Sequence, residues 1–127
     1  MNSCVLDASA LLAYLLEEPG YEAIAGLLDR AVINAVNLAE VVAKLIDKGA
    51  TEIQARQTIH NLRINILPFD EVLAFQSAAL RSATKEAGLS LGDRACLATA
   101  RRLGVPALTT DRQWSRLRVG VRVQVVR

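Results

Sequence analysis

The chain has 127 residues, a length that suits one domain burying roughly two thirds of the surface that the unfolded chain exposes. Hydrophobic residues make up 52% and aromatic residues only 4%, so Ala, Val, Leu and Ile must build the core, which suits helices on a parallel sheet. No apolar run approaches the roughly eighteen residues of a membrane span, and no basic segment precedes an apolar one at the N-terminus, which predicts a cytoplasmic location. Cys4 and Cys96 stand in apolar runs without metal-ligand spacing, which predicts reduced, buried thiols.

The net charge is only +2, but the charges are unevenly distributed along the sequence. Residues 1–80 carry five basic and ten acidic side chains, whereas residues 81–127 carry ten basic and three acidic ones. Arginine presents a planar fork that matches phosphate oxygens, so such a basic band is typical of a phosphate-binding surface. A solvated surface face explains the band about equally well.

Apolar runs alternate with stretches of helical composition along the whole chain. Strands are predicted at 3–6, 31–36, 64–68, 105–108 and 121–126. Helices are predicted at 8–18, 21–30, 38–48, 52–61, 71–87 and 91–102, with a helical turn at 113–117. The last strand alternates Val with polar residues, which indicates a sheet edge. The order predicts a single domain over residues 1–127, a three-layer α/β/α sandwich with a mostly parallel five-stranded sheet.

Residues that favour helix ends mark several of these boundaries. Thr51 and Asp70 are predicted to cap the helices that follow them. Ser90 is predicted to cap the helix 91–102, with Asp93 at its third position, and Gly104 ends that helix because glycine tolerates positive φ.

Four acidic residues lie where strands end or helices begin. Asp7 and Asp111 follow apolar strand runs, and Glu40 and Asp93 lie in the first turns of predicted helices. In a parallel sheet, all four positions fall at the same carboxyl edge.

Each acid also has an ordinary structural explanation. Asp7, Asp93 and Asp111 can each cap a helix or turn. Glu40 can pair with Lys44 one helical turn further on.

A cluster of four carboxylates has an electrostatic consequence. Two carboxylates about 5 Å apart repel each other by roughly 3 kcal/mol at an effective dielectric constant near 20, so a cation or bound protons must offset the charge. Hard oxygen ligands without His or Cys favour Mg²⁺ or Mn²⁺. Ser9, Asn37 and Thr109 could support the carboxylates or a bound water, although local capping explains Ser9 and Thr109 equally well.

Four segments of the chain resemble the acidic motifs of the PIN-domain ribonucleases, and more narrowly those of the VapC toxins of bacterial toxin–antitoxin pairs. The segments are VLDASAL at 5–11, NLAEV at 37–41, LSLGDRACLATAR at 89–101 and ALTTDRQW at 107–114. The resemblance implies a five-stranded parallel sheet, a homodimer and a VapB-type antitoxin whose tail covers the active site. The residues that it implies to be catalytic and metal-binding are Asp7, Glu40, Asp93 and Asp111, with Ser9 and Thr109 as supporting hydroxyls.

The resemblance predicts endonucleolytic cleavage of RNA that depends on Mg²⁺ or Mn²⁺ and leaves 5′-phosphate and 3′-hydroxyl ends. Relatives often carry a further acid near the last motif, where this chain has Arg112 and Gln113, so one or two metal ions fit equally well. Asn37 stands where a small hydroxyl residue is common in relatives. The candidate contacts to RNA phosphates are the basic residues nearest the motifs, Arg94, Arg101, Arg102, Arg112 and Arg116.

Three other classes of protein stay open at this stage. A phospho-acceptor receiver domain has a similar length and fold class, but it carries paired acids after the first strand, where this chain has Asp7 and then Ala8. A non-catalytic RNA-binding PIN-like module is a second alternative, although such a module is expected to lose an acid. An RNA-processing or DNA-directed nuclease outside a toxin–antitoxin pair is the third. The sequence predicts packing or surface roles for His60 and core packing for Trp114.

Overall fold

The central sheet is five-stranded and fully parallel in the computed structural model, which describes residues 2–127. The strand order is β3-β2-β1-β4-β5, with Val5 of β1 opposite both Val32 of β2 and Ala107 of β4. The strands are β1 (Cys4–Leu6), β2 (Ala31–Asn34), β3 (Asn65–Leu67), β4 (Ala107–Thr109) and β5 (Val123–Val125). The predicted fold class is confirmed, and the last strand lies at a sheet edge as predicted.

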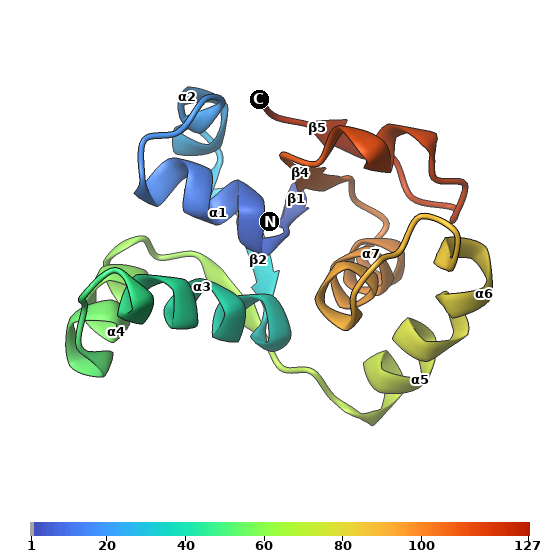
Figure 1. Ribbon diagram of the computed structural model, residues 1–127, viewed down its shortest axis with the longest axis horizontal. Helices are drawn as coiled ribbons and strands as arrows, with labels where there is room; N and C mark the ends of the chain where they lie inside the picture. Colours follow the sequence, from blue (N-terminus) through green and yellow to red (C-terminus); the bar gives the residue numbers. More distant parts are fainter. Residues whose placement is uncertain (1) are drawn as a thin grey trace.

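Helices cover both faces of this sheet, so the molecule has three layers (Figure 1). The helices on one side are α1 (Ala8–Leu15), α2 (Tyr21–Ala25), α3 (Ala35–Asp47) and α4 (Glu52–Asn61). Those on the other are α5 (Glu71–Ala79), α6 (Arg81–Thr84) and α7 (Leu91–Leu103). Short 3₁₀ turns, η1 (Leu28–Arg30) and η2 (Arg112–Arg116), precede β2 and follow β4. No helix among residues 2–127 has the length and apolar character that crossing a bilayer requires.

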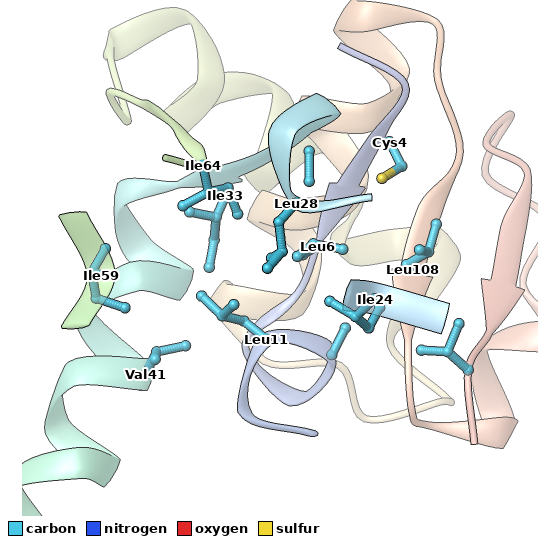
Figure 2. Close-up of a cluster of buried hydrophobic side chains, with 13 residues drawn as sticks. Cys4, Leu6, Leu11, Ile24, Leu28, Ile33, Val41, Ile59, Ile64 and Leu108 are labelled. Atoms are coloured by element: carbon cyan, nitrogen blue, oxygen red, sulfur yellow. The ribbon is translucent and has the colours of Figure 1, made fainter. Parts of the chain in front are cut away.

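Alternation along the strands divides the core into two. Leu6, Ile33 and Leu108 project from one face of the sheet toward Leu11 of α1 and Val41 of α3, as Figure 2 shows. Their immediate neighbours in the strands project to the opposite face, where they pack against α5, α7 and the buried Trp114. Both cysteines are free and buried, one in each core, as the sequence predicted. A three-residue strand can therefore hold helices on both of its faces.

Several predicted boundaries differ from those in the structure. The second strand ends at Asn34 rather than at residue 36, because the Asn34 side chain accepts a hydrogen bond from the N–H of Asn37 and caps α3. The predicted helix 71–87 is two helices, since the N–H of Leu80 bonds to the carbonyl of Ser77, three residues back, and the chain turns there. The helix predicted at 21–30 is likewise divided into α2 and η1.

Candidate active site

The first turns of three helices meet at the carboxyl edge of the sheet. Helix α1 follows β1, and the N–H of Asp7 bonds to the carbonyl of Leu108 at the end of β4. Helix α3 follows β2 directly, and α7 precedes the parallel strand β4, so the N-terminus of α7 returns to the same edge. Helix N-termini carry unpaired N–H groups and partial positive charge, which suits the binding of negatively charged groups.

Asp7 is the most deeply buried of the four predicted acids, with 4% of its surface exposed. Its Oδ1 accepts hydrogen bonds from the N–H of Ala10 at 2.8 Å and from the hydroxyl of Ser9 at 2.7 Å. Its Oδ2 accepts a bond of 2.5 Å from the hydroxyl of Thr109. The hydroxyl residues predicted to support an acid therefore both hold Asp7, and Asp7 is also the predicted N-cap of α1.

The electrostatic state of Asp7 follows from its burial. Removal from water raises the pKa of its carboxyl from 3.8 to about 6, because burial disfavours the charged form. The hydrogen bonds from Thr109, Ala10 and Ser9 act in the opposite direction, and the negative charge of Asp93 raises the pKa further. The pKa of Asp7 thus lies about two pH units above that of an ordinary aspartate.

Asp93 and Ser90 form the predicted capping box at the start of α7. The N–H of Asp93 donates to the Ser90 hydroxyl at 3.2 Å, and Asp93 Oδ2 accepts from the N–H of Ser90 at 3.0 Å. Capping and ligand binding are compatible here, because the cap engages only one carboxylate oxygen and fixes the direction of the other.

The carboxylate of Glu40 lies against Gly92, a residue that the sequence did not predict to belong to the site. The Glu40 carboxylate lies where a side chain at position 92 would be: a Cβ built on Gly92 overlaps Glu40 Oε1 and lies 2.8 Å from its Cδ. Burial raises the pKa of Glu40, and the charges of Asp93 and Asp7 raise it further. The predicted pairing of Glu40 with Lys44 does not occur among the ion pairs of residues 2–127. The sequence signal that marks Gly92 is its place inside the predicted helix 91–102, where glycine is normally unfavourable.

Asp111 lies at the same edge but faces outward. Its Oδ1 accepts a hydrogen bond from the N–H of Gln113 at 2.9 Å and caps η2, as the structural explanation predicted. Its own N–H donates to the Thr109 hydroxyl that also bonds to Asp7. Asp111 is exposed, and its charge is not among the causes of the pKa shifts of the other acids. Charge interactions therefore connect Asp7, Glu40 and Asp93, whereas Asp111 lies exposed at the same edge of the sheet.

Asn37 joins the two helices that carry Asp7 and Asp93. Its Oδ1 accepts from the N–H of Ala8 at 3.2 Å, and its Nδ2 donates to the carbonyl of Gly92 at 3.1 Å. Asn37 is 1% exposed, and this network satisfies both ends of its amide. Asn37 therefore bridges the first turns of α1 and α7, and its support of the carboxylates stays a prediction.

The carboxylates of Asp7, Glu40 and Asp93 are of the kind that bind divalent cations, but they do not surround a single point. Among residues 2–127, no three Asp, Glu, His or Cys side chains lie close enough together to hold a metal ion as they stand. The charge of Asp93 nevertheless raises the pKa values of both Asp7 and Glu40, and the charge of Asp7 raises the pKa of Glu40. Carboxylate oxygens that repel one another are the hard donors that Mg²⁺ and Mn²⁺ prefer.

The five arginines predicted to contact phosphate lie in three different places. Arg112 and Arg116 are exposed on η2, next to Asp111, and line a hollow of about 620 Å³. Arg101 and Arg102 lie about 12 to 14 Å along α7 from Asp93 at 1.5 Å per residue. Arg102 also pairs with Asp70 at 3.3 Å, so an RNA bound at the acids reaches these two residues only if it follows the whole helix.

Arg94, in the first turn of α7, is buried, and its side chain donates a hydrogen bond to the carbonyl of Ser77 at 3.2 Å. Trp114 is 1% exposed and packs in the second core, as the sequence predicted. His60 is exposed on α4 and lines a hollow between α3 and α4 that none of the four acids lines.

This fold is found in solved toxin–antitoxin structures. A chain of the DNA-bound VapBC complex from Salmonella typhimurium has a TM-score of 0.75 and 17% sequence identity over 100% of both chains. A chain of the VapBC-5 structure from Mycobacterium tuberculosis has a TM-score of 0.64 and 26% identity over 100% of this chain and 99% of that one. A toxin–antitoxin complex from Klebsiella pneumoniae gives 0.73 and 23%, over 94% and 95%. No curated protein sequence is significantly similar to this chain.

The sequence profile of the PIN domain matches residues 4–120, and the chain belongs to the PIN-domain family. PIN domains are generally nucleases that use divalent metal ions. The family predicted from the four acidic motifs is therefore confirmed.

Proposed function

We propose that this protein is a Mg²⁺- or Mn²⁺-dependent endoribonuclease and the toxin of a type II toxin–antitoxin pair. The observation that carries the proposal is the grouping of Asp7, Glu40 and Asp93 at the carboxyl edge of the sheet in a PIN domain. These three residues and Asp111 would hold the metal. The chemistry that such an ion supplies when bound is activation of water for attack on phosphorus and stabilisation of the departing 3′ oxygen.

The surrounding residues prepare the carboxylates for this role. Hydrogen bonds from Ser9, Thr109 and the N–H of Ala10 orient both oxygens of Asp7 before any ligand arrives. Ser90 orients Asp93 in the same way. Gly92 leaves the space that the carboxylate of Glu40 fills. Groups fixed in this manner do not reorganise during the reaction, which is a principal source of electrostatic catalysis.

Protonation of Asp7 sets the pH range of the proposed activity. Its raised pKa of about 6 means that a substantial fraction of Asp7 is protonated, and unable to bind a cation, in mildly acidic solution without metal. Metal binding releases that proton. We therefore expect the metal concentration required for cleavage to rise as the pH falls below about 6.

The proposed partners are an antitoxin and a second copy of this chain. VapBC complexes are among the structures that this chain resembles, which supports a VapB-type antitoxin as its partner. We also propose a homodimer in the cytoplasm, with 5′-phosphate and 3′-hydroxyl ends on the cleaved RNA, on the basis of family resemblance.

The test is incubation of total bacterial RNA with the purified protein in Mg²⁺, in Mn²⁺ and in EDTA, followed by mapping of the new ends. We expect discrete fragments with 5′-phosphate ends that appear only with metal and disappear when a cognate antitoxin is added. Absence of cleavage by folded, antitoxin-free protein that binds Mn²⁺ would overturn the nuclease proposal and favour a binding module. Metal-dependent cleavage of DNA but not RNA would overturn the substrate assignment.

A further inference from the structure

A small basic pocket lies between the stretch that includes α6 and the start of α7. It has a volume of about 220 Å³ and is lined by Arg81, Thr84, Lys85, Gly88, Leu89 and Arg94. At about 30 Å³ for each water, this volume exceeds the space that a phosphate group with four oxygens occupies. Three of the six lining residues are cationic, and none is acidic.

The cation at the base of the pocket lacks the partners that a buried guanidinium requires. Arg94 is 9% exposed, and the only hydrogen bond of its side chain within the described residues runs from Nη1 to the carbonyl of Ser77. Its buried Nε has no partner, although a guanidinium carries five N–H donors. The ion pairs of residues 2–127 involve other arginines, so no carboxylate neutralises Arg94. A buried charge without a counter-ion is unfavourable, and a bound anion would remove that penalty.

The other two cations are placed to complete the same site. Arg81 and Lys85 are exposed, and they lie four residues apart on the continuous turn that includes α6, so they occupy one side of it. Like charges at this spacing repel each other. Neither residue belongs to an ion pair within residues 2–127. An anion held between them and Arg94 would accept hydrogen bonds from all three, as arginine and lysine donate readily to phosphate oxygens.

The pocket adjoins the proposed active site through the chain itself. Arg94 follows Asp93 in the first turn of α7, and Gly88 and Leu89 precede the Ser90 cap. Asp93 does not line the pocket, because the N–H of Ser90 holds its carboxylate. We propose that this pocket binds a backbone phosphate of the RNA that lies across the acids. This inference rests on the proposed function and extends it with two residues, Arg81 and Lys85, that the sequence motifs do not include.

The direct test observes the Nε–H signal of Arg94 by ¹H–¹⁵N NMR, with the signal assigned through bonds in the isotopically labelled wild type. Inorganic phosphate is titrated at constant ionic strength, and acetate serves as the carboxylate control. We expect phosphate, but not acetate, to shift the signal, and a short single-stranded RNA in EDTA to shift it as well. An equal response to acetate, or no response to phosphate, overturns the phosphate site. A response to phosphate without a response to RNA overturns the RNA assignment and leaves a free phosphate as the ligand.

Lys85 provides a test that does not depend on the buried Arg94, whose replacement can unfold the protein. Lys85 and Lys48 are both exposed C-cap lysines, on α6 and α3, so Lys85→Ala and Lys48→Ala remove the same charge from matched positions. RNA affinity is measured by fluorescence anisotropy in EDTA over a range of KCl concentrations. We expect Lys85→Ala to weaken binding and to reduce the slope of log K against log[salt] by about 0.7, the loss of one single-strand phosphate contact. We expect Lys48→Ala to match the wild type.

The two proposals fail in different ways. Equal slopes for Lys85→Ala and Lys48→Ala, with metal-dependent cleavage intact in the wild type, overturn the phosphate pocket alone. Loss of slope in Lys85→Ala only, in a protein that binds RNA but does not cleave it, supports the pocket and overturns the nuclease.

Discussion

Gly92 determines whether Glu40 can lie beside Asp7 and Asp93. A glycine inside a helix normally costs about 0.5 to 1 kcal/mol relative to alanine, and Gly92 has an ordinary helical φ. Local backbone conformation therefore gives no reason for a glycine at this position. The reason is tertiary, because the Glu40 carboxylate occupies the volume of a Cβ.

Replacement of this glycine is expected to separate stability from activity. In Gly92→Ala the Glu40 carboxylate must move by an ångström or more, and a misplacement of about 1 Å costs roughly 10²-fold in rate. We expect cleavage to fall by about that factor while the midpoint of thermal unfolding changes little. Gly26→Ala is the matched control, because nothing lies within 4 Å of a Cβ there and its φ is −78°. Unchanged cleavage by Gly92→Ala would remove Glu40 from the active site.

The buried carboxyl of Asp7 is expected to make the metal-free protein less stable as the pH rises. Its pKa is about 6 in the fold and near 3.8 without burial, so between these values the folded state binds more protons than the unfolded state. The free energy of unfolding therefore falls as the pH rises from about 4 to 6, by about 3 kcal/mol for this group. Asp7→Asn removes the effect.

Urea unfolding of the wild type and of Asp7→Asn in EDTA, at pH 4.5 and pH 7, measures this difference. We expect the variant to gain stability relative to the wild type between the two pH values. A difference between the two proteins that is the same at both pH values would show that Asp7 titrates as an ordinary exposed carboxyl.

At the scale of elements, the site depends on how three helix starts are joined. Asp7, Asn34 and Ser90 each cap the helix that follows. Asn37 then links the first turns of α1 and α7 through two hydrogen bonds. The acids are thus fixed by capping interactions that are local in sequence, together with one bridge that is not.

Removal of that bridge is expected to affect stability and activity together. Asn37→Ala leaves the N–H of Ala8 without its partner and removes the second hydrogen bond to the carbonyl of Gly92, which costs about 1 to 3 kcal/mol. Thr51→Ala is the control, since it removes the cap of the remote helix α4 at a cost of about 1 kcal/mol. Urea unfolding and cleavage assays under folding conditions are expected to show reduced kcat for Asn37→Ala only. If both variants retain full kcat, Asn37 has a structural role alone.

The elements also show which parts of the molecule local sequence can predict. The caps at Thr51, Asp70 and Ser90 were predictable, because each places a side-chain oxygen next to backbone N–H groups a few residues away. The start of α3 was not, because AVINAVN offers Asn34 and Asn37 as caps three residues apart, and packing decides between them. The break at Leu80 interrupts a stretch of uniformly helical composition, so no local signal marks it.

At the scale of the whole molecule, the sheet separates two cores and gathers the acids at one edge. The meeting of the four acid positions at one edge was predictable because parallel strands place their carboxyl ends together. The basic pocket was not, because it combines Arg94 with two residues from α6 that no motif connects to the acids. All three cations of this pocket belong to the basic stretch 81–127.

The central claim is that the acids at this edge support metal-dependent cleavage of RNA, and two matched aspartates test it most directly. Asp93 and Asp70 both lie at helix N-termini with a carboxylate that accepts a backbone N–H, but only Asp93 lies among the other acids. Single-turnover cleavage of a defined RNA is measured against Mn²⁺ concentration for the wild type, Asp93→Asn and Asp70→Asn. We predict a loss of roughly 10²- to 10³-fold for Asp93→Asn, the size typical for one electrostatic group in an active site, and near wild-type rates for Asp70→Asn. Equal rates for all three proteins, or cleavage that persists in EDTA, would contradict the account.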